Sequence, residues 1–170
     1  MTPARGASPL PPPTSNLLVR PATRDDLATV VALRLALLAE HKDNPVYSRQ
    51  RPDAPARARR LFASQLESAH ETTFLAEEGG AAVGILRCVS SQGSPLLEPP
   101  GYCYVSSVYV VPAARRRGVL RALLARAERW ALERGFPEIR LHSVAGHAGS
   151  NAAWDAMGFE VVELLRVRKL

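Results

Sequence analysis

The 170-residue chain contains only two cysteines, Cys88 and Cys103, and four histidines. Two cysteines cannot supply the disulfide framework of a small secreted scaffold, and the short Cys and His spacings typical of zinc sites are absent from the sequence. Both cysteines lie in apolar, strand-like stretches, where a thiol usually packs as a small hydrophobic group. We therefore expect two buried, reduced thiols and no bound metal.

The sequence also lacks any stretch of about 18 uncharged apolar residues, the length that a membrane-spanning helix needs. Its first fifteen residues offer little apolar surface beyond Leu10, and they lack the apolar run of a secretory signal. We expect residues 1–15 to be a disordered, proline-rich tail and residues 16–170 to form a single domain. We also expect a cytoplasmic protein with no membrane partner.

Lysine is scarce, because all but two of the 22 basic residues are arginine, and the net charge is +6. This positive field favours an anionic ligand such as a nucleotide cofactor, and it makes nucleic acid the rival partner. The chain has no interleaved aromatic residues, no helix-turn-helix pattern and no strand of the RNA-recognition type. We therefore do not expect a nucleic-acid partner.

Hydrophobic periodicity and turn residues predict alternating strands and helices. Residues 23–26 form a capping box that opens a helix, and residues 77–80 separate two strand patterns as in a hairpin. The order of elements predicts an α/β (α+β) fold, a mixed sheet with helices on both sides. The expected strands are 17–19, 72–76, 82–89, 102–111 and 138–143 with a final pair within 159–170, and the expected helices are 23–40, 55–69, 114–135 and 149–157.

Residues 108–124 combine a strand, an arginine-rich turn and a helix. The N–H groups at a helix start point outward, and the helix dipole adds about half a positive charge there, so a pyrophosphate can bind mainly to backbone. Gly118 would let that backbone approach a ligand closely. The arginines 115–117 could simply be a solvated helix start, but three cations there oppose the helix dipole, and an anion would relieve this conflict. The segment therefore predicts an anion-binding site.

The turn Arg115-x-x-Gly118-x-Leu120 resembles the Gln/Arg-x-x-Gly-x-Gly/Ala pyrophosphate loop of the GNAT acetyltransferases. Other stretches are similar to motifs of that family and stand in its order. They are the opening Arg20 to Leu27, the hairpin strand Gly80 to Leu86, the Val-x-Val-x-Pro strand ending at Val108, Val110 and Pro112, and the closing helix His147 to Phe159. The resemblance covers residues 17–170.

This resemblance implies a GNAT fold, a mixed central sheet of about six or seven strands with about four helices on its two faces. The fourth and fifth strands would splay apart near Val108 and Leu141. Acetyl-CoA would be the co-substrate, and its acetyl group would pass to a primary amine by direct attack in a ternary complex. Backbone groups of the fourth strand would pair with the pantetheine amides, and an N–H near Val110 would polarise the thioester carbonyl. The residues implied in cofactor binding are Val108, Tyr109, Val110, Arg115, Arg116, Arg117, Gly118, Val119, Leu120, Arg121, His147, Ser150 and Trp154.

Three positions depart from the family pattern. Leu120 replaces the second small residue of the loop and could crowd the pyrophosphate, and His147 replaces an Asn that usually contacts the cofactor. Trp154 stands where many members have a Tyr that protonates the departing thiolate. Indole has no acidic hydroxyl, but a thiol with a pKa of roughly 8.5 can leave without an acid. We therefore expect Trp154 to pack against the cofactor.

The base that accepts the amine proton has three candidates. The strand 102–111 has no carboxylate, although many GNAT members have a Glu there, but Tyr104 and Ser106 share one of its faces. His142, on the neighbouring strand, resembles in position a catalytic acid residue of some ribosomal-protein acetyltransferases. We favour His142, because an ordinary imidazole pKa of about 6.5 suits proton acceptance at neutral pH, while a purely structural His is the alternative. Cys103 lies on the other strand face, which argues against an acetyl-cysteine intermediate.

Two rival functions follow from the same residues. Trp154 and the missing strand carboxylate would also suit a catalytically weak acyl-CoA-binding module, and the arginines would suit an Arg-rich nucleic-acid-binding protein. The acceptor, a small-molecule or peptide amine, is not specified, because the segments expected to line its pocket carry the least pattern. A homodimer through the Val- and Leu-rich C-terminal strands is also compatible with the sequence.

Overall fold

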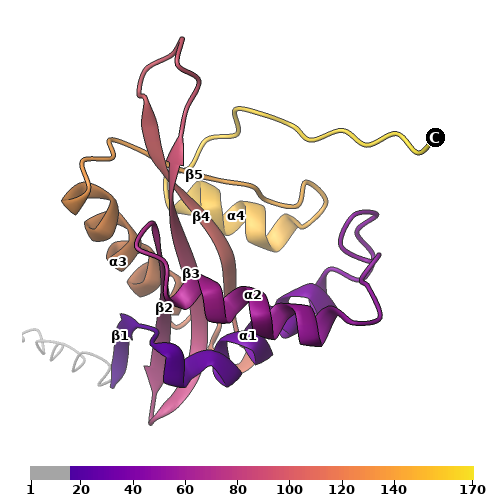
Figure 1. Cartoon of the computed structure of the whole chain (residues 1–170), viewed down its shortest axis with the longest axis vertical. Helices are drawn as coiled ribbons and strands as arrows, with labels where there is room; N and C mark the ends of the chain where they lie inside the picture. The colour runs from indigo at the N-terminus through magenta and orange to yellow at the C-terminus, as the bar shows by residue number, and fades with distance from the viewer. Residues whose placement is uncertain (1–15) are drawn as a thin grey trace, which may run out of the picture.

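The computed structural model describes residues 16–170 and is built around a five-stranded sheet in the order β1-β2-β3-β4-β5 (Figure 1). Neighbouring strands are antiparallel except β4 and β5, which are parallel. The strands are β1 (Leu17–Pro21), β2 (Glu71–Glu78), β3 (Ala81–Gln92), β4 (Gly101–Val110) and β5 (Ile139–Leu141). The helices are α1 (Leu27–Glu40), α2 (Ala54–Leu66), α3 (Val119–Glu133) and α4 (Ala148–Ala156), with short 3-10 turns at Arg24–Asp26 and Pro112–Ala114.

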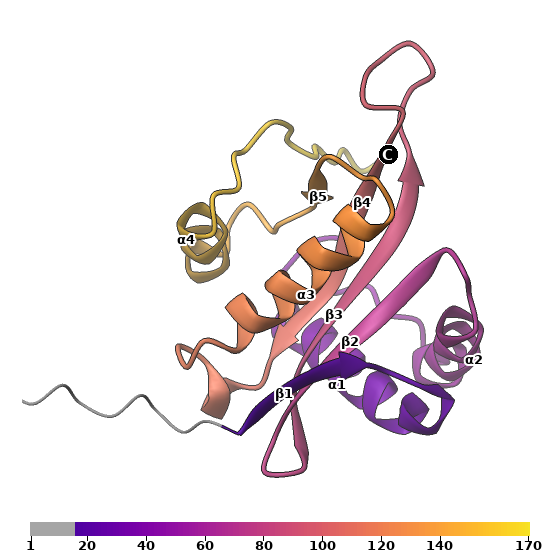
Figure 2. The same ribbon diagram turned by 90° about the vertical axis from the view of Figure 1, so that its left-hand side faces the viewer.

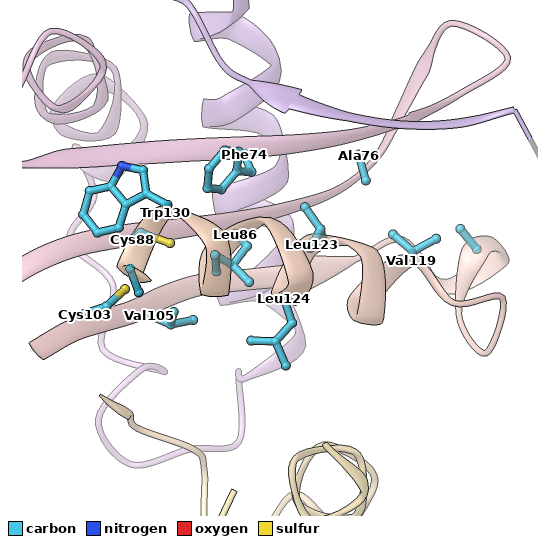
Figure 3. Packing of buried hydrophobic residues seen from close by; sticks show 13 residues of the cluster. Phe74, Ala76, Leu86, Cys88, Cys103, Val105, Val119, Leu123, Leu124 and Trp130 are labelled. Carbon is cyan, nitrogen blue, oxygen red and sulfur yellow. The ribbon is translucent and has the colours of Figure 1, made fainter. Parts of the chain in front are cut away.

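Two hydrophobic clusters hold helices against opposite faces of the sheet (Figure 2). In the first cluster α3 packs Leu123 and Trp130 against Phe74 and Leu86 of the strands (Figure 3). In the second cluster α1 and α2 cover the other face, with Val30, Leu33 and Phe62 packed on Leu75 and Ile85. The expected mixed sheet with helices on both sides is therefore present. Among the described residues, no helix is both long and apolar enough to cross a membrane.

The expected sheet of six or seven strands is not confirmed, because the described residues contain five. The sequence predicts a final strand pair within residues 159–170, but this segment forms neither helix nor strand. Its apolar side chains have no strand to pair with, and Val162 and Leu165 are each 85% exposed. Figure 1 shows the segment running outward from the body of the fold. The proposed tail, residues 1–15, lies outside the described residues.

A β-bulge in β4 decides which side chains face α1 and α2. Ile85 pairs with Tyr109, whereas Arg87 pairs with Ser106, so β4 has one residue more than β3 between these pairs. Ser107 takes the extra position with a φ angle of 60°. Because a bulge reverses the alternation of side chains, Tyr109 packs in the α1–α2 cluster, although Val105 packs under α3.

Cys88 and Cys103 are both buried and not joined by a disulfide, as the sequence predicts. They lie in the cluster under α3, beside Val105 (Figure 3). The hydrogen bond with Cys103 and burial raise the pKa of the Cys88 thiol. Cys103 is thus enclosed on the α3 side of β4, and Tyr104 points to the other face.

Candidate active site

The turn between β4 and α3 leaves the N-terminus of a long helix open. Arg116 and Gly118 have positive φ angles of 59° and 85°, and α3 begins only at Val119. The expected helix start at Ala114 is therefore wrong, because these left-handed residues interrupt the helix. The Ala122 N–H donates to the Gly118 carbonyl at 3.0 Å. The preceding N–H groups, 119–121, have no acceptor within the helix and point toward the turn.

Glycine is favoured at position 118 because the backbone there is left-handed, with a φ angle of 85°. A left-handed backbone costs another residue roughly 1–2 kcal/mol. A Cβ at this position would meet nothing within 4 Å in the described part of the chain, so the space in front of the turn is open. Val119 is buried under the sheet, which leaves only its backbone to face that space, and Leu120 is half-buried.

The arginines of this turn divide into two groups. Arg115 donates from Nε to the Val110 carbonyl at 2.9 Å and pairs with Glu40 of α1. Arg117 pairs with Glu78 of β2 at 2.6 Å. These carboxylates neutralise part of the positive charge that the sequence places before the helix. Arg116 and Arg121 are exposed and form no ion pair within residues 16–170.

β4 and β5 are paired over three residues only, Cys103–Val105 with Ile139–Leu141. In the described residues, the rest of β4 has β3 as its only strand neighbour. Val108 and Val110 lie in that half, directly before the open turn. The sheet therefore separates between its fourth and fifth strands, and one edge of β4 is left available for hydrogen bonding.

The side chains of α4 that the resemblance implies in cofactor binding have local partners. His147 caps the helix, since its Nδ1 accepts a hydrogen bond from the Ser150 N–H at 3.1 Å. Trp154 packs on Phe159, with ring centroids 5.4 Å apart. A hollow between α3 and α4 lies beside this helix and extends from Arg121 to Met157.

Tyr104 and His142 meet at the point where β4 and β5 separate. Tyr104 Oη lies 2.9 Å from His142 Nδ1, and the two rings stand nearly edge to face. The sequence predicts a strand over residues 138–143, but β5 ends at Leu141, so His142 follows the strand and is exposed. Burial, followed by the influence of Tyr47 and Tyr102, raises the pKa of Tyr104. Tyr104 therefore keeps its proton at neutral pH.

Ser106 is not part of this pair. Its hydroxyl accepts a hydrogen bond from Arg87 of β3 at 3.2 Å, and Arg87 also pairs with Glu71 of β2. The Arg87 and Glu71 side chains are only 19% and 13% exposed. Sequence reasoning missed both residues. The available signal was Arg87, the one charged residue of β3, whereas Glu71 only precedes an apolar stretch and carries no such signal.

His41 was also missed, because it lies at the very end of the α1 pattern. Its ring is 5.6 Å from that of His147 and 5.7 Å from that of Tyr47, measured between centroids. Burial and the neighbouring His147 lower the pKa of His41. The contact brings the end of α1, the start of α4 and the α1–α2 loop together.

Known structures share this architecture. A predicted acetyltransferase with acetyl-CoA from Clostridium acetobutylicum is 19% identical, with a TM-score of 0.74 over 89% of this chain and 96% of that one. An aminoglycoside N-acetyltransferase, AAC(6')-Iy in complex with CoA, is 23% identical, with a TM-score of 0.74 over 95% of this chain and 99% of that one. At these identities the likeness establishes the fold.

Sequence comparison identifies the family. An aminoglycoside N(6')-acetyltransferase type 1 of Salmonella typhimurium is 26% identical over 105 residues, which are 58% of this chain and 68% of that protein. The protein of the same name from Klebsiella aerogenes is 40% identical over 70 residues, 38% of this chain and 46% of that protein. The acetyltransferase (GNAT) family model matches residues 35–159, most of the chain. With the open turn before α3 and the split between β4 and β5, this match shows that the chain belongs to the GNAT acetyltransferase family.

Proposed function

We propose that this chain transfers the acetyl group of acetyl-CoA to a primary amine of a small molecule, by direct attack in a ternary complex. The observation that carries the proposal is the open N-terminus of α3, with a left-handed Gly118, next to the half of β4 that pairs with β3 but, in the described residues, has no strand on its other edge. A helix N-terminus suits a pyrophosphate, and a strand edge suits the amides of an extended chain. The relatives named above for aminoglycoside acetylation support a small-molecule amine.

The described residues fit acetyl-CoA as co-substrate. The N–H groups 119–121, together with Arg116 and Arg121, would bind the phosphates. Val108 and Val110 would pair through their backbones with the pantetheine arm, and a nearby N–H would polarise the thioester carbonyl. Trp154, which packs on Phe159, is an apolar wall rather than an acid. The hollow lined by Arg121 and Met157 would take the remaining part of the nucleotide.

The acceptor amine must lose a proton before or during its attack on the acetyl carbon. We assign this role to His142, with Tyr104 as its hydrogen-bonding partner. If Nδ1–H donates to Tyr104 Oη, Nε2 is left with a lone pair that can accept the amine proton. Ser106, held by Arg87, could instead hold a water near the same face. Either route keeps the chemistry on the α1–α2 side of β4.

The experiment that tests the function combines ligand binding with turnover. Acetyl-CoA should raise the melting temperature much more than NAD or ATP, because a ligand that binds only the folded state stabilises it by mass action. A panel of primary amines should then release CoA in a protein-dependent reaction. Strong binding without turnover of any amine would indicate the acyl-CoA-binding module. Equal shifts with all three nucleotides, or salt-sensitive affinity for nucleic acid that is indifferent to CoA, would contradict the cofactor assignment.

We also propose that the chain forms a homodimer through residues 161–170. The apolar side chains of this segment are exposed in the single chain, and Val161, at 73%, is typical of them. An extended apolar segment without a strand partner gains hydrogen bonds and burial when it joins a sheet of a second copy. Sedimentation should give twice the mass of one chain, and replacing Val162 and Leu165 by Glu should shift the protein to monomers. A monomeric parent protein would contradict this.

A further inference from the structure

One arginine on the acceptor side of the sheet has no counter-charge. Arg34 of α1 lies over the ring of Phe62, with its guanidinium carbon 5.4 Å from the ring centroid. Its Nε is fully buried and has no hydrogen-bond partner among the described residues. Burial, together with the nearby charge of Arg87, lowers the pKa of Arg34, although the group stays cationic.

Two other sheltered arginines, Arg20 and Arg87, have carboxylates. Arg20 binds both Asp26 and Glu77, at 2.8 and 2.6 Å. Arg87 pairs with Glu71. Glu71 is already paired with Arg87, and no carboxylate within residues 16–170 forms an ion pair with Arg34. A partly buried cation without a counter-charge lowers the free energy of unfolding. An anionic ligand that binds to this cation would therefore stabilise the folded protein.

Arg34 lies next to the proposed chemistry. Arg87 follows Ile85 by two residues on β3 and so faces the side of the sheet where Arg34 packs over Phe62. It donates to Ser106 of β4, which shares its strand face with Tyr104. Arg34 and His41 stand two turns apart on the same face of α1, and the His41 ring lies 5.7 Å from that of Tyr47, so this face of α1 leads from Arg34 to the α1–α2 loop. Arg126 also has a buried Nε without a partner in the described chain, but it packs on Phe74 at the α3 side of the sheet, where Glu133 lines the same hollow.

We propose that Arg34 binds a carboxylate of the acceptor, so that the substrate is a primary amine that also carries a carboxylate group. This inference rests on the proposed acetyl transfer and specifies its acceptor. A guanidinium binds a carboxylate through paired N–H donors, which fixes orientation as well as charge. The amine at the other end of such an acceptor would then face Tyr104 and His142. An acceptor with several ammonium groups, such as an aminoglycoside, would instead meet like charge at this position.

The test compares ω-amino acids of increasing length with their own carboxamides, which present the same amine without the negative charge. For the length that fits, the acid should have a kcat/KM at least about tenfold above its amide, since a charged hydrogen-bonded pair is formed only with the acid. Arg34→Met should remove that preference, lowering kcat/KM for the acid by about tenfold and for the amide by less than about twofold. Arg60→Met, a loss of the same charge from the exposed side of α2, should change neither.

Stability gives a second measurement on the same variant. Arg34→Met replaces an unpaired cation by an apolar side chain of similar length, so its melting temperature should rise by about 2 to 4 °C. The preferred acid, added with CoA, should stabilise the parent protein and not this variant. Equal kcat/KM for acids and amides, or acetylation of polyamines in preference to both, would overturn the inference and leave the acetyl transfer standing. If acetyl-CoA binds but no amine is acetylated, the proposed function fails, and the ligand-induced shifts then decide whether Arg34 binds carboxylates.

Discussion

Gly118→Glu lowers the affinity for acetyl-CoA by more than about tenfold, which corresponds to about 1.4 kcal/mol or more of binding free energy. The expected loss has two causes. The new carboxylate stands in the open space in front of the N–H groups 119–121, where the phosphates would bind, and it repels them. It also competes for those same N–H groups and for the nearby cation Arg116. Calorimetric titration with acetyl-CoA measures the effect.

A matched control exists at the other end of α3. Gly135 has a φ angle of 73°, close to the 85° of Gly118, and a Cβ there would also meet nothing within 4 Å in the described chain. Gly135→Glu therefore imposes similar backbone strain and the same charge, away from the turn, and should keep the parent affinity. Gly118→Ala separates strain from charge and should have an intermediate effect. Unchanged affinity in Gly118→Glu would mean that this turn does not bind the cofactor.

The sequence predicts the elements around this turn because local signals define them. Pro112 ends β4, and glycines at 79 and 80 with positive φ make the β2–β3 hairpin. The bulge at Ser107 has no comparable signal, because serine ordinarily avoids a positive φ, and only the pairing of β3 with β4 reveals it. The strand pair predicted within residues 159–170 is absent for a similar reason. Residues 159–170 alternate well enough for a strand, but strand formation needs a partner that the single chain does not present.

In the candidate site, too, some contacts can be predicted from the sequence and others depend on the tertiary structure. Strand order alone predicts that Tyr104 and His142 lie near each other, because β4 and β5 are neighbours, although the register pairs Tyr104 with Arg140 and puts His142 two residues further along. The ion pairs could not be predicted from the sequence, since Arg115 pairs with Glu40 and Arg117 with Glu78 across long sequence separations. Arg34 lies among the apolar residues of α1, and the sequence pattern there does not show whether a carboxylate faces it. Its lack of a counter-charge becomes visible only when the neighbouring strands are in place.

His142→Ala should lower kcat by at least about tenfold while the affinity for acetyl-CoA stays nearly intact, because general-base catalysis typically contributes a factor of about 10² to 10⁴. His142 is placed for this role by its hydrogen bond to Tyr104 at the split between β4 and β5, on the side away from the buried Cys103. Tyr104 itself is a poor base, since burial raises its pKa. A base must be deprotonated to act, so activity should rise with pH along an acid limb, and the variant should lose that limb.

Four further variants separate the role of His142 from those of other residues. Tyr104→Phe removes the hydroxyl that orients the imidazole and should lower kcat less than His142→Ala does, and the double variant should be no slower than His142→Ala alone, because the tyrosine acts through the histidine. Trp154→Phe should cost only a few-fold, since an indole packed on Phe159 has no acidic proton to give to a leaving thiolate. His70→Ala removes an exposed histidine at the start of β2 and serves as the control. If His142→Ala keeps the kcat of the parent protein across pH 6 to 9, the proton acceptor is a water held by Ser106 or bulk solvent, because such a water needs no imidazole.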